Sequence, residues 1–185
     1  ALARRYDVDT DQAARVEQAA LALFDQVAAT CGLGEEERDQ LSWAARVHEI
    51  GLSIAHSQYH RHGAYVLRHS DIAGFSEQDQ QILAALVRCH RREISRSTLS
   101  ALPERSADST LRCLVVLRLA VLLHRSHDPS PLPPLSLQIQ GGSVRLSLPN
   151  GWLDAHPLTR SDLDAERDYL APFGLLLQID AEETR

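Results

Sequence analysis

Three arginines and a histidine stand together in the segment Arg88-Cys89-His90-Arg91-Arg92, where a predicted helix ends. A guanidinium group presents a planar fork of donors that suits the oxygens of a phosphate. One or two basic residues at a helix C-terminus would answer the helix dipole, but this cluster exceeds what capping requires. It therefore favours binding of an anionic ligand.

A second group of candidates lies in the histidine-rich segment 56–62, which contains His56, His60 and His62. His56 and His60 are four residues apart, the spacing at which two side chains on one helix face could share a metal. Ser57, however, resembles a helix cap, which would leave His56 outside the helix, and no cysteine pair supplies further ligands. We expect an anion-binding mouth at a helix N-terminus here, and no tight metal site.

His48 and Glu49 come at the end of another predicted helix. A histidine beside an acid at such a position could ligate a divalent metal, with further ligands from other helices. The alternative is a histidine favoured by the helix dipole next to a solvated glutamate. Taken alone, the dipeptide favours the alternative.

The most apolar predicted helix carries Arg118 and is followed by His124 and Arg125. An arginine inside so apolar a segment needs a partner. Glu49 could be a structural partner and a bound phosphate a functional one, and the sequence does not separate the two.

Charge is distributed unevenly along the chain, whose formal net charge is −6. All 19 basic residues are arginine, and residues 56–127 hold ten of them against six acidic residues, with seven of the nine histidines. This pattern indicates either an anionic ligand at one face or ion pairs with the acidic flanks. Aromatic residues make up 5% and do not interleave with the arginines, so nucleic acid is not an expected partner.

Other features bound the class of protein. No apolar run is long enough for a membrane span, and the three cysteines, Cys31, Cys89 and Cys113, are too scattered for a disulfide framework. We therefore expect a reducing, cytoplasmic location. The chain has no methionine, and we interpret it as a piece of a longer protein.

Apolar spacing predicts helices over about 10–31, 35–50, 57–69, 76–90 and 109–123, with a loop at 93–108. A proline-rich linker follows, then a hairpin over 135–148 that turns at Gly141-Gly142, a helix from Thr159 or Ser161 to Leu170, and a strand over 175–179. The predicted fold class is α+β and mainly helical. Residues 1–128 would form the helical unit and 129–185 a small β-β-α-β piece.

Several motifs together resemble a known family: His48-Glu49-Ile50-Gly51, Tyr59-His60-Arg61-His62-Gly63-Ala64-Tyr65-Val66-Leu67, Val87-Arg88-Cys89-His90-Arg91-Arg92, Arg118-Leu119-Ala120-Val121-Leu122-Leu123-His124-Arg125-Ser126, and Trp152-Leu153 with His156-Pro157-Leu158. The chain resembles the C-terminal half of the bacterial exopolyphosphatase and guanosine pentaphosphate phosphatase family. This resemblance covers nearly the whole chain.

The resemblance implies an HD-domain-like helical unit followed by a small α+β piece. Catalysis would reside in an actin-like N-terminal half with its expected Mg²⁺, and this fragment would hold no cofactor. Compared with metal-dependent HD phosphohydrolases, the first ligand histidine falls near Gln12, the histidine–aspartate pair is His48-Glu49, and the later aspartate is Val121. The resemblance thus implies a phosphohydrolase fold without the metal chemistry.

We therefore expect this fragment to be non-catalytic and to bind inorganic polyphosphate or guanosine pentaphosphate while the N-terminal half cleaves the terminal phosphate. The candidate substrate-binding residues are His48, Glu49, His60, His62, Arg88, His90, Arg91, Arg92, Arg118, His124 and Arg125. The resemblance also implies a homodimer. Two alternatives stay open: a residual phosphohydrolase that uses His48 and Glu49 with manganese or magnesium, and a dimerisation module.

Overall fold

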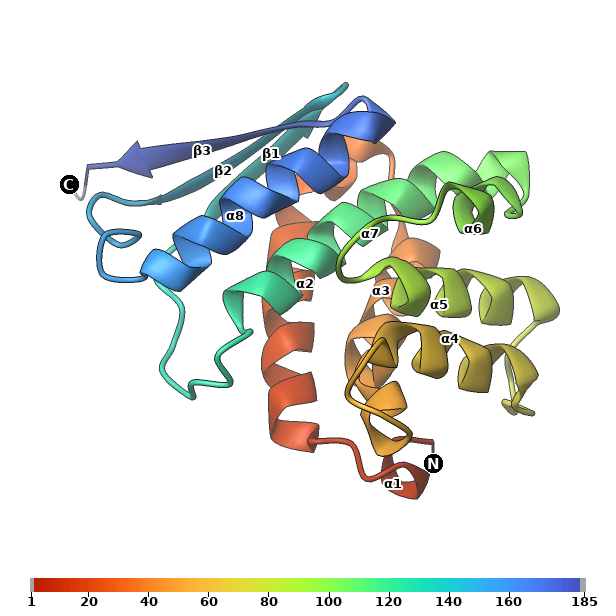
Figure 1. Cartoon of the computed structure of the whole chain (residues 1–185). Coiled ribbons are helices and arrows are strands. Elements are labelled where there is room, and N and C mark those ends of the chain that lie inside the picture. Colours follow the sequence, from red (N-terminus) through yellow and green to blue (C-terminus); the bar gives the residue numbers. More distant parts are fainter. Residues whose placement is uncertain (1, 184–185) are drawn as a thin grey trace.

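The computed structural model describes residues 2–183, and over these residues the fold is α+β and mainly helical, as the sequence predicts. Helices come first, and a small sheet with one further long helix follows (Figure 1). The helices are α1 (Leu2–Arg5), α2 (Thr10–Cys31), α3 (Glu35–Val47), α4 (Tyr59–His69), α5 (Glu77–Cys89), α6 (Arg96–Ser100), α7 (Glu104–Leu123) and α8 (Pro157–Leu170), with 3₁₀ turns η1 (Ile50–Ser53) and η2 (Ala171–Phe173). The strands are β1 (Ser136–Gln140), β2 (Ser143–Pro149) and β3 (Leu176–Glu182).

Helix α7 lies at the centre, as its apolar sequence predicts, and packs against α2, α3, α5, α6 and α8. Local capping fixes where its neighbours begin. The side chain of Asp9 accepts a hydrogen bond from the backbone N–H of Gln12 at the start of α2. Ser76 and Asp79 form a reciprocal capping box at the start of α5. Both caps satisfy amide groups that would otherwise have no partner.

The sheet has the strand order β1-β2-β3. The predicted hairpin is confirmed, since β1 and β2 pair antiparallel, and the predicted third strand pairs parallel with β2 after the chain crosses through α8. Leu137 and Ile139 on β1, Leu146 on β2 and Leu177 on β3 are buried in the same apolar core as the helices. Packing of β1 on α2 thus fixes the sheet, and with it α8, on the helical part of the molecule.

The segment predicted as a loop over residues 93–108 is largely helical, so that prediction is wrong. The Ser95 hydroxyl accepts from the N–H of Thr98 and caps α6, while Leu99 and Leu102 are buried. Helix α7 then begins at Glu104, directly after Pro103. Two leucines three residues apart are too few for apolar periodicity to indicate a helix in this segment.

Three predicted helix ends also shift. The helix predicted to begin at Ser57 begins at Tyr59, after Gln58 in a left-handed conformation with φ 53°. Helix α8 begins at Pro157, a residue suited to a first helical position, and not at Thr159 or Ser161. Helix α3 ends at Val47, before the predicted stop at Gly51.

Gly51 has a different role, because the chain folds tightly back upon it. A Cβ atom at this position would overlap the carbonyl oxygen of Tyr59 and the amide nitrogen of Gly63. Only glycine allows α4 to approach η1 so closely. This contact sets the position of Tyr59, which contributes to the site described below.

Candidate anion-binding site

A cavity of about 420 Å³ lies where α8 meets the C-terminal ends of α5 and α7. Its walls come from segments far apart in the sequence. The lining residues are Glu49, Leu52, His56, Tyr59, His90, Arg91, Arg92, Arg118, Val121, Leu122, Arg125, His127, Asp162, Ala165, Glu166 and Tyr169.

The structure places six of the eleven predicted site residues on this cavity, namely Glu49, His90, Arg91, Arg92, Arg118 and Arg125. His48 lies next to it, with its ring in edge contact with that of His90 at 5.2 Å between centroids. The other four do not line it.

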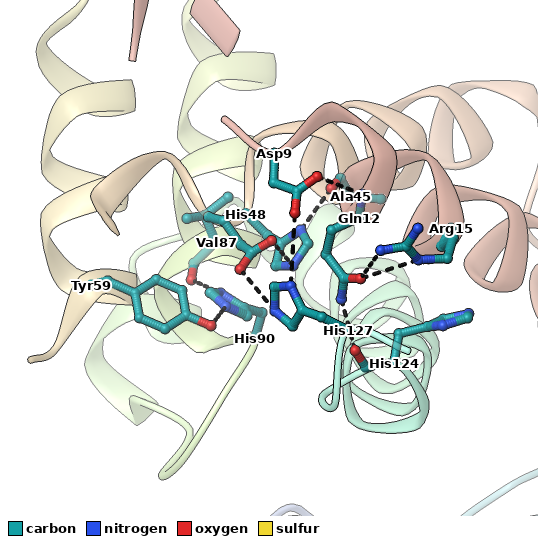
Figure 2. A network of polar contacts seen from close by, with 11 residues as sticks. Asp9, Gln12, Arg15, Ala45, His48, Tyr59, Val87, His90, His124 and His127 are labelled. Atoms are coloured by element: carbon teal, nitrogen blue, oxygen red, sulfur yellow. Dashed lines mark hydrogen bonds and ion pairs between the residues drawn. The ribbon is translucent and has the colours of Figure 1, made fainter. Parts of the chain in front are cut away.

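Those four residues are dispersed around α4, α5 and α7. His60 is buried beside His90, at 6.4 Å between ring centroids, and His62 is half-buried on α4. Arg88 lines a separate groove between α4, α5 and α6. His124 is buried at the end of α7, where its backbone carbonyl accepts from the side-chain amide of Gln12 at 2.7 Å (Figure 2).

Arg118 lines the cavity, and its partner among the described residues is Glu166 and not Glu49. Its Nε and Nη2 donate to the two carboxylate oxygens of Glu166 over 2.6–3.0 Å. Nη1 donates to the carbonyl of Cys89 and Nη2 also to that of Arg92. With each guanidinium nitrogen bonded and only 3% of the residue exposed, Arg118 ties α7 to α8 and to the end of α5.

Helix α8 supplies polar residues, two of them acidic, that the sequence analysis did not select. Asp162, Glu166 and Tyr169 all line the cavity, and Asp162 accepts from Arg125 at 2.6 Å. Their spacing of four and then three residues places them on one helix face. That spacing was the available signal, but it indicates only a shared face and not which arginines the face meets.

A layer of two buried histidines, His48 and His90, adjoins the cavity, and Figure 2 shows their side chains. Nδ1 of His48 contacts the carbonyl of Ala45 at 2.6 Å, and Nδ1 of His90 contacts that of Val87 at 2.5 Å. A carbonyl oxygen only accepts, so each Nδ1 carries the proton and each Nε2 is an acceptor. Burial lowers the pKa of His48 to about 4 and the pKa of His90 well below its ordinary value, so both rings are neutral at neutral pH.

Two contacts join this layer to the cavity, one between Tyr59 and His90 and one between Glu49 and His48, whose Nε2 lies 3.9 Å from Oε1 of Glu49. The Tyr59 hydroxyl lies 3.3 Å from Nε2 of His90 and donates to it. Glu49, which one sequence interpretation left solvated, is 6% exposed, and burial raises its pKa. One of its oxygens lies 3.6 Å from His127, whereas the other has no hydrogen-bond partner among the described residues.

The positively charged side of the cavity is formed by Arg91 and Arg92. Within residues 2–183 neither side chain has a hydrogen bond or an ion pair, and the Arg91 guanidinium lies over the Tyr59 ring at 4.5 Å. Burial lowers the pKa of Arg91, and repulsion from Arg92 and Arg125 adds to that effect. Arg92 also has a φ of 58°, which is unusual for a residue with a side chain.

The residues present do not provide a ligand set for a metal. No group of three histidine, cysteine, aspartate or glutamate side chains in the described part of the chain is arranged to hold an ion. Val121, on the cavity wall, has no ligand atom, and Gln12 uses its side chain in bonds to His124 and Arg15.

One comparison with known proteins bears on this fold and cavity. The family described as "Ppx/GppA phosphatase, domain III" matches residues 1–167. The chain therefore belongs to the Ppx/GppA phosphatase family and contains its domain III, which confirms the resemblance seen in the sequence motifs. In residues 2–183 no helix has the length and apolar character needed to cross a membrane.

Proposed function

We propose that this chain is the polyphosphate-binding module of an exopolyphosphatase-like enzyme, with inorganic polyphosphate or guanosine pentaphosphate as its ligand. Arg91 and Arg92 would contact phosphate oxygens at the cavity while a separate catalytic part of the enzyme removes the terminal phosphate. The observation that supports this proposal best is that neither arginine has an ion-pair or hydrogen-bond partner among residues 2–183, in a chain with 25 acidic residues and 19 arginines.

The charges around the cavity support the same proposal. Of its three acidic residues, Glu166 is bonded to Arg118 and Asp162 to Arg125. The third, Glu49, is buried with a raised pKa. None of these three carboxylates forms an ion pair with Arg91 or Arg92 among the described residues, and a phosphate would supply acceptors for both guanidinium groups.

Backbone geometry points in the same direction. Arg92 and His127 line the cavity, and both have positive φ, at 58° and 57°. Residues with side chains adopt this conformation at some cost, and such positions cluster at ligand-binding sites. In Arg92 the backbone carbonyl accepts a hydrogen bond from Arg118, while the guanidinium group has no partner among the described residues.

The test is calorimetric titration of long-chain polyphosphate into the chain, in EDTA, at low and at moderate salt. We expect binding without metal that weakens steeply as salt rises, because a polyanion releases counterions when arginines neutralise it. Arg91→Glu/Arg92→Glu should abolish most of this binding. Arg4→Glu/Arg5→Glu is the matched control, since it changes the charge equally at two adjacent exposed arginines outside the cavity.

Far-UV circular dichroism and the thermal midpoint establish that each variant is folded, and Arg91→Gln/Arg92→Gln repeats the test without adding negative charge. Equal affinity in wild type and the Arg91/Arg92 variants would contradict the site. Failure of the wild type to bind at low salt would contradict the function itself. A measurement of oligomeric state would then test whether this surface instead contacts a second copy.

A further inference from the structure

A second groove, of about 340 Å³, lies on the side of the molecule formed by α4, α5 and α6. Three arginines line it: Arg61 and Arg68 from α4 and Arg88 from α5. The described residues that line the groove include no aspartate or glutamate. A groove with three arginines and no acidic wall is an unusual feature in a chain whose formal net charge is −6.

The arrangement on α4 makes the groove accessible. Arg61, Tyr65 and Arg68 follow one another at spacings of four and three residues, so they share one helix face. Tyr65 is 67% exposed. Arg61 and Arg88 form no ion pair within residues 2–183, and the single contact of Arg68, to Glu77 at 3.7 Å, joins two exposed side chains and is weak.

Arg88, on the last turn of α5, comes three residues before Arg91, so the groove and the cavity have arginines at neighbouring positions of the chain. His60 lies near arginines of both sets, since the charges of Arg91 at the cavity and of Arg88 and Arg61 at the groove act on its ring. Burial, and after it repulsion from Arg91, Arg88 and Arg61 in that order, lowers the pKa of its ring to about 4. The ring is 4% exposed, and its Nδ1 has no hydrogen-bond partner among the described residues.

We propose that this groove is a second phosphate-binding subsite and that a long polyphosphate chain occupies it and the cavity together. Arg61, Arg68 and Arg88 would contact phosphates beyond those held by Arg91 and Arg92. The inference rests on the proposed function, but it adds a distinct prediction. Affinity should depend on chain length, because only a long polymer reaches both subsites.

The experiment compares long-chain polyphosphate with tripolyphosphate by calorimetry in EDTA, using wild type, Arg61→Glu/Arg68→Glu, Arg91→Glu/Arg92→Glu and the control Arg4→Glu/Arg5→Glu. We expect the Arg61/Arg68 variant to lose about tenfold in long-chain affinity, with a salt dependence that is shallower by about 1 to 2 in slope. Its ratio of long-chain to tripolyphosphate affinity should fall. The Arg91/Arg92 variant should lose affinity for both probes.

Arg61→Gln/Arg68→Gln excludes simple repulsion by new glutamates, since it removes only the positive charges. An unchanged affinity ratio in both Arg61/Arg68 variants would overturn the second subsite and leave the cavity proposal standing. If wild type binds neither probe at low salt, the proposed function fails, and this inference fails with it. The two failures are therefore distinguishable.

Discussion

Arg118 and Arg91 line the same cavity, yet their surroundings differ completely. Arg118 is buried and donates to a carboxylate and two carbonyls, whereas Arg91 donates to no group within residues 2–183 and rests on the ring of Tyr59. An arginine that is buried and paired contributes to the fold, because removing it leaves the partner carboxylate buried without a counter-charge. An arginine without such a partner contributes little to the fold, and its N–H donors are available to a ligand. The comparison teaches that residue type alone does not assign the role.

The largest expected effect is on the buried pair. Glu166→Ala leaves the guanidinium of Arg118 buried without its carboxylate, and we expect the free energy of unfolding to fall by about 3–5 kcal/mol. Urea unfolding measures it. Arg118→Met/Glu166→Leu should cost less than the single change, because it removes both charges. A loss below about 1 kcal/mol for Glu166→Ala would contradict a structural role for the pair and would mean that Arg118 behaves like an exposed arginine.

The buried histidines should make stability depend on pH. The unfolded chain takes up a proton at His48 as pH falls through about 6.5, but the folded chain does so only near pH 4. The contribution of His48 to the free energy of unfolding is therefore fully present above about pH 6.5. It is lost as pH falls towards 4, and the loss amounts to about 3 kcal/mol.

Urea unfolding of wild type and His48→Gln between pH 7.5 and pH 4.5 measures this contribution. The variant should lose stability less steeply, because glutamine does not titrate. Glu49, whose pKa is raised by burial, acts in the opposite sense. Parallel curves would contradict the assignment of a neutral, buried His48.

The ring beneath Arg91 should have a smaller effect, on binding. Tyr59→Leu removes the aromatic face and should weaken polyphosphate binding about two- to fivefold, since a cation–π contact contributes about 0.5–1 kcal/mol at such a site. Tyr59→Phe is the matched control, because it keeps the ring and loses only the hydrogen bond to His90. Equal loss in both variants would mean that the hydroxyl, and not the ring, positions Arg91.

The smallest effect is expected at the exposed pair of Arg125 and Asp162, where 67% of the Arg125 side chain is exposed. Asp162→Ala should change the free energy of unfolding by less than about 1 kcal/mol. It frees another guanidinium at the cavity and should raise polyphosphate affinity slightly. A loss of stability as large as that of Glu166→Ala would remove the distinction between the two pairs.

Short-range patterns predicted much of this molecule. Helical spacing gave α2, α3, α5 and the centre of α7, and the Gly141-Gly142 turn between alternating leucines gave the hairpin. The cluster at Arg88–Arg92 was found because its members are adjacent. The sequence did not reveal the partner of Arg118, because Glu166 lies 48 residues away and contacts Arg118 only once α8 packs against α7. Likewise, no local signal shows that Arg88 and Arg91 line different hollows.

The central claim is that Arg91 and Arg92 serve a ligand and not the fold. The most direct measurement is the slope of log affinity against log salt for long-chain polyphosphate, in wild type and in Arg91→Gln/Arg92→Gln, with the free energy of unfolding of both proteins. We predict a slope reduced in magnitude by about 1 to 2, with stability changed by less than about 0.5 kcal/mol per substitution. An unchanged slope, or a large loss of stability, would contradict the claim.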